Sequence, residues 1–274
     1  MTRRLPTLLG LLILLIALAT ALVGPALVPH DPFSQDLGHR LNPPVWLGGT
    51  ADHPFGTDGL GRDYLARLVY GARISLLIGA AVAVTSGVIG ITLGLLGGFY
   101  GGRLDDVVMF VITCRLSIPI ILVALAVVSA VGSSFTLVIL TLGLLLWDRF
   151  AVVARTTTMQ VRTLDYVAAA QAAGASRVHV LLREVLPNIA PHLVVVATLE
   201  VALAILLEAT LSFLGLGVPA PLPSWGLMIA EGNDFMFFDP WIVMIPGVAL
   251  FVLVLGINLL GDGLRDLFGI ARRV

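Results

Sequence analysis

Six long apolar stretches divide this chain, and they constrain its fold more than any other feature of the sequence. Each holds about 20 mostly apolar residues, the length that a helix needs to cross a bilayer. They are predicted near Leu5–Val28, Ser75–Leu96, Asp106–Val131, Phe135–Val153, Ile189–Leu214 and Trp241–Leu260. Only 12% of the residues are charged, against about 25% in soluble domains. The sequence therefore predicts an all-α membrane protein with six transmembrane helices.

The distribution of arginines predicts the orientation of these helices. Basic residues favour the cytoplasmic side of a membrane, and every basic residue of this chain is an Arg. If the N-terminus lies inside, Arg115 falls within a span and four arginines lie outside, namely Arg40, Arg62, Arg67 and Arg73. The others lie inside: Arg3, Arg4, Arg103, Arg149, Arg155, Arg162, Arg177, Arg183, Arg265, Arg272 and Arg273. Both termini are therefore expected in the cytoplasm.

The first apolar stretch has an alternative interpretation as a cleaved signal peptide, because Arg3 and Arg4 precede it. Its apolar core is longer than that of a usual signal peptide, and no clean Ala-x-Ala cleavage site follows. We therefore interpret it as the first transmembrane helix.

The sequence shows no motif for catalysis or for binding a metal or cofactor. The loops are too short to form a domain with its own core, and no metal-ligand cluster, phosphate loop or nucleophile–base arrangement stands out. A net charge of -1 without a basic face gives no reason to expect nucleic acid. We therefore expect no catalytic residue, metal site or cofactor here. If the activity of this protein requires energy, a partner protein or an ion gradient must supply it.

One polar segment, DYVAAAQAAGASRVHVLLREVLPN, interrupts the apolar pattern between the fourth and fifth spans. Asp165 is a plausible N-cap for a helix over Tyr166–Ala173. Gly174 suits the left-handed position that ends a helix. Ser176 is predicted to cap a second helix, over about 177–186, and Pro187 to end it.

In the second of these helices, the apolar residues Val178, Leu181, Leu182 and Val185 are predicted to form one stripe, with Val180 outside it. Helices this short are marginal alone in water, so the pair must rest on another surface. The first helix is rich in Ala and would let a partner approach its backbone closely. Residue pattern alone leaves two interpretations open: a docking elbow for another protein, or an amphipathic connector lying on the membrane.

This segment resembles the EAA loop of ABC importer permeases, whose helices dock on the ATP-binding subunit. The matching positions are Ala169, Ala170, Gly174, Leu186 and Pro187. One position departs from the family pattern, because Ala168 stands where relatives usually have Glu. The resemblance implies a coupling loop over residues 154–188 that includes Asp165, Tyr166 and Ser176.

Further motifs resemble the C-type subunits of dipeptide and oligopeptide permeases. They are VPHDPFSQDLGHRLNPP, HPFGTDGLGRDYLARLVYGARISL, LSFLGLGVPAPLPSWGLMI and GDGLRD, in the order expected for that family. The positions on the expected outer side that match are Gly56, Thr57, Asp58, Gly61, Arg62, Asp63, Gly215, Gly217, Trp225 and Gly226.

This resemblance implies the type I ABC importer (MetI-like) permease fold in a prokaryotic cytoplasmic membrane. It divides the chain into an N-terminal helix and start of the outer loop (1–55), an outer segment (56–74) and a permease domain (75–270). Implied partners are a second, B-type permease subunit, two ATP-binding subunits that hold ATP and Mg, and an extracytoplasmic peptide-binding protein. The implied cargo is a dipeptide or oligopeptide, with nickel complexes and glutathione as alternatives.

Arg115, Glu200 and Glu208 are charged residues within predicted spans whose roles the sequence helps to interpret. Such residues usually face a bundle interior or a water-filled cavity. Arg115 is predicted to line the translocation path beside a kink at Pro119, or else to pair with a carboxylate for packing. Glu208 is expected to position the outer end of the fifth helix. Glu200 lies about 80° around that helix from Glu208, so the two do not form a paired site.

Two other functional classes stay open at this point. An ion-coupled secondary transporter would need an ion site in the membrane and often has internal repeats, and few acidic residues lie in the spans. A membrane-embedded hydrolase would need a nucleophile and a base or a metal. The importer permease accounts for more of the sequence than either.

Overall fold

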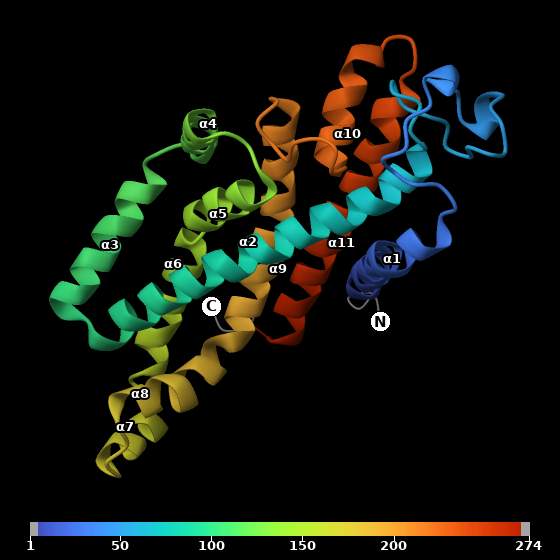
Figure 1. The fold of residues 1–274 in the computed structure, drawn as a ribbon. Helices are drawn as coiled ribbons and strands as arrows, with labels where there is room; N and C mark the ends of the chain where they lie inside the picture. Colours follow the sequence, from blue (N-terminus) through green and yellow to red (C-terminus); the bar gives the residue numbers. More distant parts are fainter. Residues whose placement is uncertain (1–4, 270–274) are drawn as a thin grey trace.

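The computed structural model describes residues 5–269, which form an all-helical bundle (Figure 1). The four longest helices are α1 (Leu5–Leu27), α2 (Tyr64–Tyr100), α9 (Leu186–Phe213) and α11 (Trp241–Leu267). The shorter ones are α3 (Gly102–Leu116), α4 (Ile120–Val131), α5 (Phe135–Leu145), α6 (Asp148–Val161), α7 (Asp165–Ala172), α8 (Arg177–His179) and α10 (Trp225–Gly232). Within residues 5–269 there is no β-strand, only an isolated bridge between Thr57 and Asp63.

Five helical segments are long and apolar enough to cross a membrane, and a bent pair brings the number to six. The bent pair is α3 and α4, which meet at 80°. A continuous helix over 106–131 was expected to kink at Pro119, and the structure instead breaks it there. Pro119 has no N–H and disfavours helical geometry in the residue before it. It becomes the N-cap of α4.

The second span begins eleven residues earlier than the predicted Ser75. Asp63 caps α2, and its Oδ1 accepts a hydrogen bond of 2.6 Å from the Ala66 N–H. Because the second span was predicted to begin at Ser75, Arg67 was expected in the outer loop before it. In the structure Arg67 is 1% exposed, and the carboxylates of Asp58 and Glu231 compensate its charge.

Helix α2 crosses the middle of the bundle and packs closely against α6. Three glycines at four-residue spacing, Gly90, Gly94 and Gly98, face α6. A Cβ atom at these positions would overlap the carbonyl oxygens of Trp147, Ala151 and Arg155, respectively. Small residues at this spacing let two membrane helices approach closely. This pattern is visible in the sequence, and our sequence interpretation did not use it.

The start of α1 lies against the end of α11. Thr7 lies beside Gly263, and Gly10 lies beside Gly256. The two helices are therefore antiparallel, and the two ends of the described chain lie on the same side of the bundle. Arg3, Arg4, Arg272 and Arg273, which entered the predicted orientation, lie outside the described residues.

The polar segments collect at opposite ends of the molecule. Figure 1 shows α7 and α8 at one end, and α10 with the loop between α1 and α2 at the other. We call the first region the elbow (residues 162–185). The second (residues 28–63 and 215–240) we call the outer cap, after the side of the membrane that the sequence predicts for it.

Candidate functional site

The elbow is built from two short helices joined by a tight turn. Gly174 has φ +85°, which confirms the left-handed position predicted for it. The Ser176 Oγ accepts a hydrogen bond of 3.3 Å from the His179 N–H, so the second predicted cap is also confirmed. The first cap was predicted wrongly. Asp165 is the first residue of α7, and Leu164 precedes it without a side-chain cap.

Pro187 does not end the second helix, contrary to the prediction. The chain passes from α8 through a π-helix over Val180–Val185 directly into α9. The wide π-turn accommodates the proline ring, and the Asn188 side-chain amide donates to the Glu184 carbonyl at 2.6 Å. A π-turn of this kind is rare and often marks a functional position.

The same π-turn changes which apolar residues face the bundle. Val180, Leu181 and Val185 are buried, whereas Val178 and Leu182 are exposed. The predicted stripe, which assumed 3.6 residues per turn, is therefore wrong at Val178, Leu182 and Val180. The buried residues pack with Val167 of α7 in one hydrophobic cluster, which fixes the elbow to the bundle.

The outward surface of α7 presents small side chains to solvent. Ala168 and Ala169 are exposed, and Ala170 is half-buried. Tyr166 is 39% exposed, and partial burial, followed by the Glu184 carboxylate, raises the pKa of its hydroxyl. The Tyr166 hydroxyl is therefore an uncharged hydrogen-bonding group at neutral pH.

A polar hollow of about 570 Å³ lies beside α7 and is bordered by Arg162 and Arg177. Arg162 Nη1 donates to the Phe99 carbonyl at 3.0 Å. The Arg177 guanidinium lies 5.7 Å from the centre of the Tyr100 ring. Both arginines thus tie the elbow to the end of α2. Leu186 and Pro187 lie at the start of α9.

Substituting Gly174 tests the elbow turn. The Gly174→Ala change is expected to destabilise the turn by about 1–2 kcal/mol, the cost of the left-handed region for a residue with a Cβ. The space around Gly174 is open, so no steric clash contributes. Gly174→Asn is the matched control, because Asn tolerates this region better. Proteolysis of residues 162–185 in the purified chain measures the effect; equal cleavage of both variants and the unchanged chain would contradict it.

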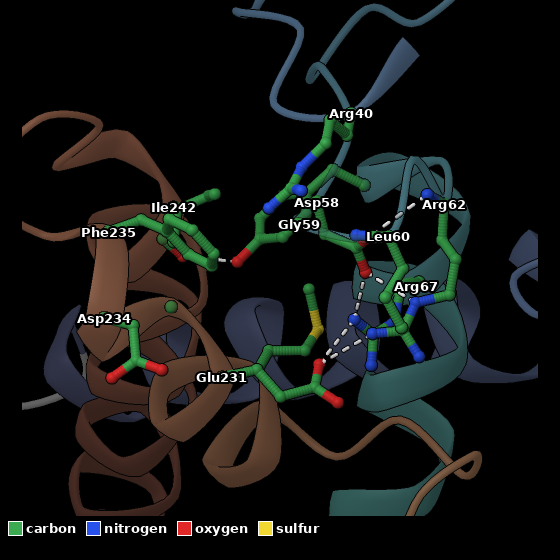
Figure 2. Close-up of a pocket in the computed structure, with 13 residues that line it drawn as sticks. Arg40, Asp58, Gly59, Leu60, Arg62, Arg67, Glu231, Asp234, Phe235 and Ile242 are labelled. Atoms are coloured by element: carbon green, nitrogen blue, oxygen red, sulfur yellow. Dashed lines mark hydrogen bonds and ion pairs between the residues drawn. The ribbon is translucent and has the colours of Figure 1, made fainter. Parts of the chain in front are cut away.

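At the other end of the molecule, the outer cap holds a buried charge cluster (Figure 2). Asp58 Oδ2 accepts from Arg62 Nε at 2.6 Å and from Arg67 Nη1. Glu231, on α10, accepts from Arg62 Nη2 at 3.0 Å and from Arg67 Nη1 at 2.6 Å. Two arginines and two carboxylates therefore join the start of α2 to α10.

The glycines of the outer motif shape the loop that carries Asp58. Gly56 and Gly61 have φ values of +77° and +74°. A Cβ atom on Gly61 would also overlap the Asp36 carbonyl. Thr57 is fully buried, and its Oγ1 accepts from the Asn42 N–H at 3.0 Å. The glycine conformations and these contacts within residues 28–63 thus fix the shape of the loop.

The charge cluster borders a cavity of about 330 Å³. Arg40, Asp234 and Phe235 also line this cavity (Figure 2). Within residues 5–269, Arg67 Nε and Nη2 have no hydrogen-bond partner. The cavity therefore combines an accessible charged rim with a fixed guanidinium.

Comparison with known proteins identifies the family of this chain. Residues 90–273 match the family described as "Binding-protein-dependent transport system inner membrane component". Residues 6–44 match the "N-terminal TM domain of oligopeptide transport permease C". The chain belongs to this permease family. It is a multi-pass protein of the inner membrane.

Curated relatives cover nearly the whole permease. The "Di/tripeptide transport system permease protein DppC" of Pseudomonas aeruginosa is 42% identical over 94% of this chain and 85% of that protein. The "Oligopeptide transport system permease protein OppC" of Bacillus subtilis is 35% identical over 94% of this chain and 83% of that protein.

Solved structures have the same fold as the permease. An inward-facing form of the MetNI methionine ABC transporter has a TM-score of 0.59 at 21% identity, covering 74% of this chain and 96% of that chain. An amino acid ABC transporter crystallised with histidines has a TM-score of 0.53 at 15% identity, covering 77% and 95%. The MetI-like fold predicted from the resemblance is confirmed.

Glu208 of the permease joins α9 to the start of α10. Its Oε1 accepts hydrogen bonds from Ser212 Oγ at 2.7 Å and from Ser224 Oγ at 2.8 Å. Ser224 in turn caps α10. Nearby, Gly215 has φ +77° and follows the end of α9, and Gly217 lies so close to Ser212 that a Cβ atom would overlap it. The geometry agrees with a role of Glu208 in positioning the end of this helix.

Trp225 and Gly226 fix α10 within the permease. The Trp225 indole N–H donates to the Leu68 carbonyl at 2.9 Å, and its backbone N–H donates to Ser75 Oγ at 3.3 Å. Gly226 lies against Ala209, where a Cβ atom would overlap the backbone. These positions therefore hold α10 between α2 and α9.

Arg115 lies at the end of α3 and reaches the junction of α5 and α6. Its Nε donates to the Leu145 carbonyl at 2.6 Å, and its Nη2 lies 3.9 Å from Asp148 Oδ1. The proximity of Asp148 agrees with the alternative interpretation, in which Arg115 packs beside a carboxylate. A role in the translocation path stays a prediction.

The structure also brings together residues that the sequence interpretation did not connect. His30, Asp52 and His53 form a group whose ligand atoms lie within 4.8 Å of one another. The expectation of no metal site stays a prediction, although the fold brings these three potential ligands together. Spacing in the sequence gave no signal for this group, because His30 lies 22 positions before Asp52 and meets it only through the fold of the loop.

Proposed function

We propose that this permease is the C-type membrane subunit of an ATP-driven importer of dipeptides or oligopeptides. Its partners in this proposal are a homologous B-type permease, two ATP-binding subunits and an extracytoplasmic binding protein. The chain itself provides no catalytic group and no cofactor site for the reaction. ATP and Mg bind the partner ATPases. The names of the relatives from Pseudomonas and Bacillus support the peptide class.

The elbow carries the coupling part of this proposal. Ala168 and Ala169 are exposed, so a groove on an ATP-binding subunit can approach the backbone of α7 closely. Arg162 and Arg177, which line the polar hollow beside α7, border the same surface. The elbow would then face the cytoplasm, where the ATPases lie, and both termini would lie on that side. Val178 and Leu182 are exposed and lie four residues apart, so they present an apolar edge that suits the amphipathic-connector interpretation. The exposed alanines of α7 favour docking on a protein.

A size series at Ala169 tests this coupling role. In the complete complex reconstituted in liposomes, Ala169→Trp is expected to lower binding-protein-stimulated ATPase activity about tenfold or more, a loss of about 1.4 kcal/mol in coupling. Ala169→Ser is the matched control and should retain most of the activity. The large Trp side chain would keep the docking groove of the ATP-binding subunit away from the α7 backbone. Equal activity of the two variants in correctly assembled complexes would contradict docking at α7.

Uptake of a labelled dipeptide tests the function itself. Import should require ATP on the side of the membrane where the ATP-binding subunits lie. It should also require the binding protein on the opposite side. Import that stops with an uncoupler while ATP is held constant would indicate an ion-coupled transporter instead. Import of nickel complexes or glutathione, but no peptide, would keep the importer and overturn the proposed cargo.

A further inference from the structure

Three side chains with metal-binding atoms meet in the loop between α1 and α2. His30 Nε2 lies 3.7 Å from Asp52 Oδ1, and His53 Nε2 lies 3.9 Å from Asp52 Oδ2. The two imidazole rings lie 4.8 Å apart between their centres. The same nitrogen of both rings, Nε2, is thus turned toward one carboxylate.

A fourth residue fixes the orientation of His53. The His53 Nδ1 atom lies 2.8 Å from Asp63 Oδ2, and the Asp63 side chain is 2% exposed. The other Asp63 oxygen accepts the Ala66 N–H as the cap of α2. A carboxylate that accepts in this way makes Nδ1 the protonated nitrogen and leaves the lone pair of Nε2 toward Asp52. A carboxylate behind a histidine is the usual support of a metal-bound imidazole.

We propose that His30 Nε2, His53 Nε2 and the Asp52 carboxylate form a zinc site in the outer cap. Two imidazoles and one carboxylate are a donor set that Zn²⁺ favours, with a water in the fourth position. Ligand atoms around a tetrahedral Zn²⁺ lie about 3.3 Å apart at the usual bond lengths. In this structure the two imidazoles face different oxygens of Asp52, at 3.7 and 3.9 Å, and the three ligand atoms lie within 4.8 Å of one another. Binding would therefore draw the ligand atoms together by up to about 1.5 Å.

The exposure of the three side chains suits ion entry. Asp52 is 78% exposed and His30 is 32% exposed, whereas His53 is 16% exposed and rests on Asp63. One ligand is therefore open to solvent, whereas both histidines lie beside the buried Asp63 carboxylate. A bound ion would connect the residue just after α1 to the segment that leads into α2, and so would fix the loop beside the outer charge cluster. This proposal is independent of the transported substrate.

Zinc binding to the purified full chain in detergent tests the proposal. The chain must carry no histidine tag, and a chromophoric chelator serves as competitor. About one Zn²⁺ per chain is expected, and His30→Ala, His53→Ala and Asp52→Asn should each weaken binding about 10- to 100-fold. His39→Ala is the matched control, because His39 lies in the same loop and pairs with Asp36 at 2.7 Å, outside the group. This control should bind zinc as the unchanged chain does.

Asp52→Asn guards the test against misfolding, since the side chain of Asp52 is 78% exposed and its ion pairs within residues 5–269 are those with His30 and His53. Co²⁺ in place of Zn²⁺ provides a second measurement, because its visible absorption reports tetrahedral nitrogen and oxygen ligands. Absence of zinc binding above the level of the His30→Ala/His53→Ala double variant would overturn the proposal. So would an equal loss in His39→Ala, or retention of Cu²⁺ or Ni²⁺ without any binding of Zn²⁺.

Discussion

Replacing Asp58 by Ala is expected to destabilise the permease by about 3 kcal/mol, because it leaves two buried arginines with one carboxylate between them. Asp58 accepts from the side chains of both arginines and from the Leu60 and Arg62 N–H groups. The side chain of Arg67 is 1% exposed, so losing one of its two carboxylate partners leaves a buried charge only partly compensated. Glu231 stays in contact with both arginines, which keeps the loss near the lower end of the range for a broken buried pair.

The free energy of unfolding in detergent measures this effect. Asp234→Ala is the matched control, since Asp234 borders the same cavity and is exposed, and surface changes usually stay within about 0.5 kcal/mol. Asp58→Asn should fall between the two, because it retains hydrogen-bond acceptance without the charge. If Asp58→Ala unfolds like the control, the cluster does not hold α2 to α10.

Adding one methyl group at Gly94 is expected to have the second large effect. In most helices Gly→Ala stabilises by about 1 kcal/mol. At Gly94 the new Cβ atom would overlap the Ala151 carbonyl of α6, and overpacking costs about 1–3 kcal/mol. The sign of the substitution should therefore reverse, with the helices α2 and α6 forced apart.

Gly247→Ala in α11 is the matched control, because a Cβ added there would meet no atom within 4 Å among residues 5–269 beyond its chain neighbours and the adjacent backbone of its own helix. It should leave stability unchanged or raise it. The two variants can be compared by unfolding in the same detergent. A stabilising Gly94→Ala would mean that α2 and α6 do not approach as closely as described.

Local signals in the sequence predicted local geometry well. Gly174 and Ser176 take the positions expected of them, because a left-handed residue and a helix cap depend on only a few neighbours. Pro119 marks the break in the third span for a similar reason. Six apolar stretches were sufficient to predict the helical membrane fold.

Contacts between distant segments could not be predicted in this way. Arg67 and Glu231 lie 164 positions apart, and no periodicity connects them. The π-turn after His179 also escaped prediction, since residue pattern assumes a constant helical period. It changed the buried side chains of the elbow and carried the helix past Pro187. The His30 and His53 pair depends on the same kind of long-range folding of a loop.

The π-turn makes one continuous rod of the chain from Arg177 to Phe213. At about 1.5 Å per residue, its 37 residues reach from the elbow to the Glu208 region at the opposite end. In the proposed importer, a rotation of the elbow would act on a lever arm that is fixed to α10 through Glu208 and Ser224. The six residues of the π-turn lie near the base of this arm, so their stiffness would set how much of that rotation reaches α10.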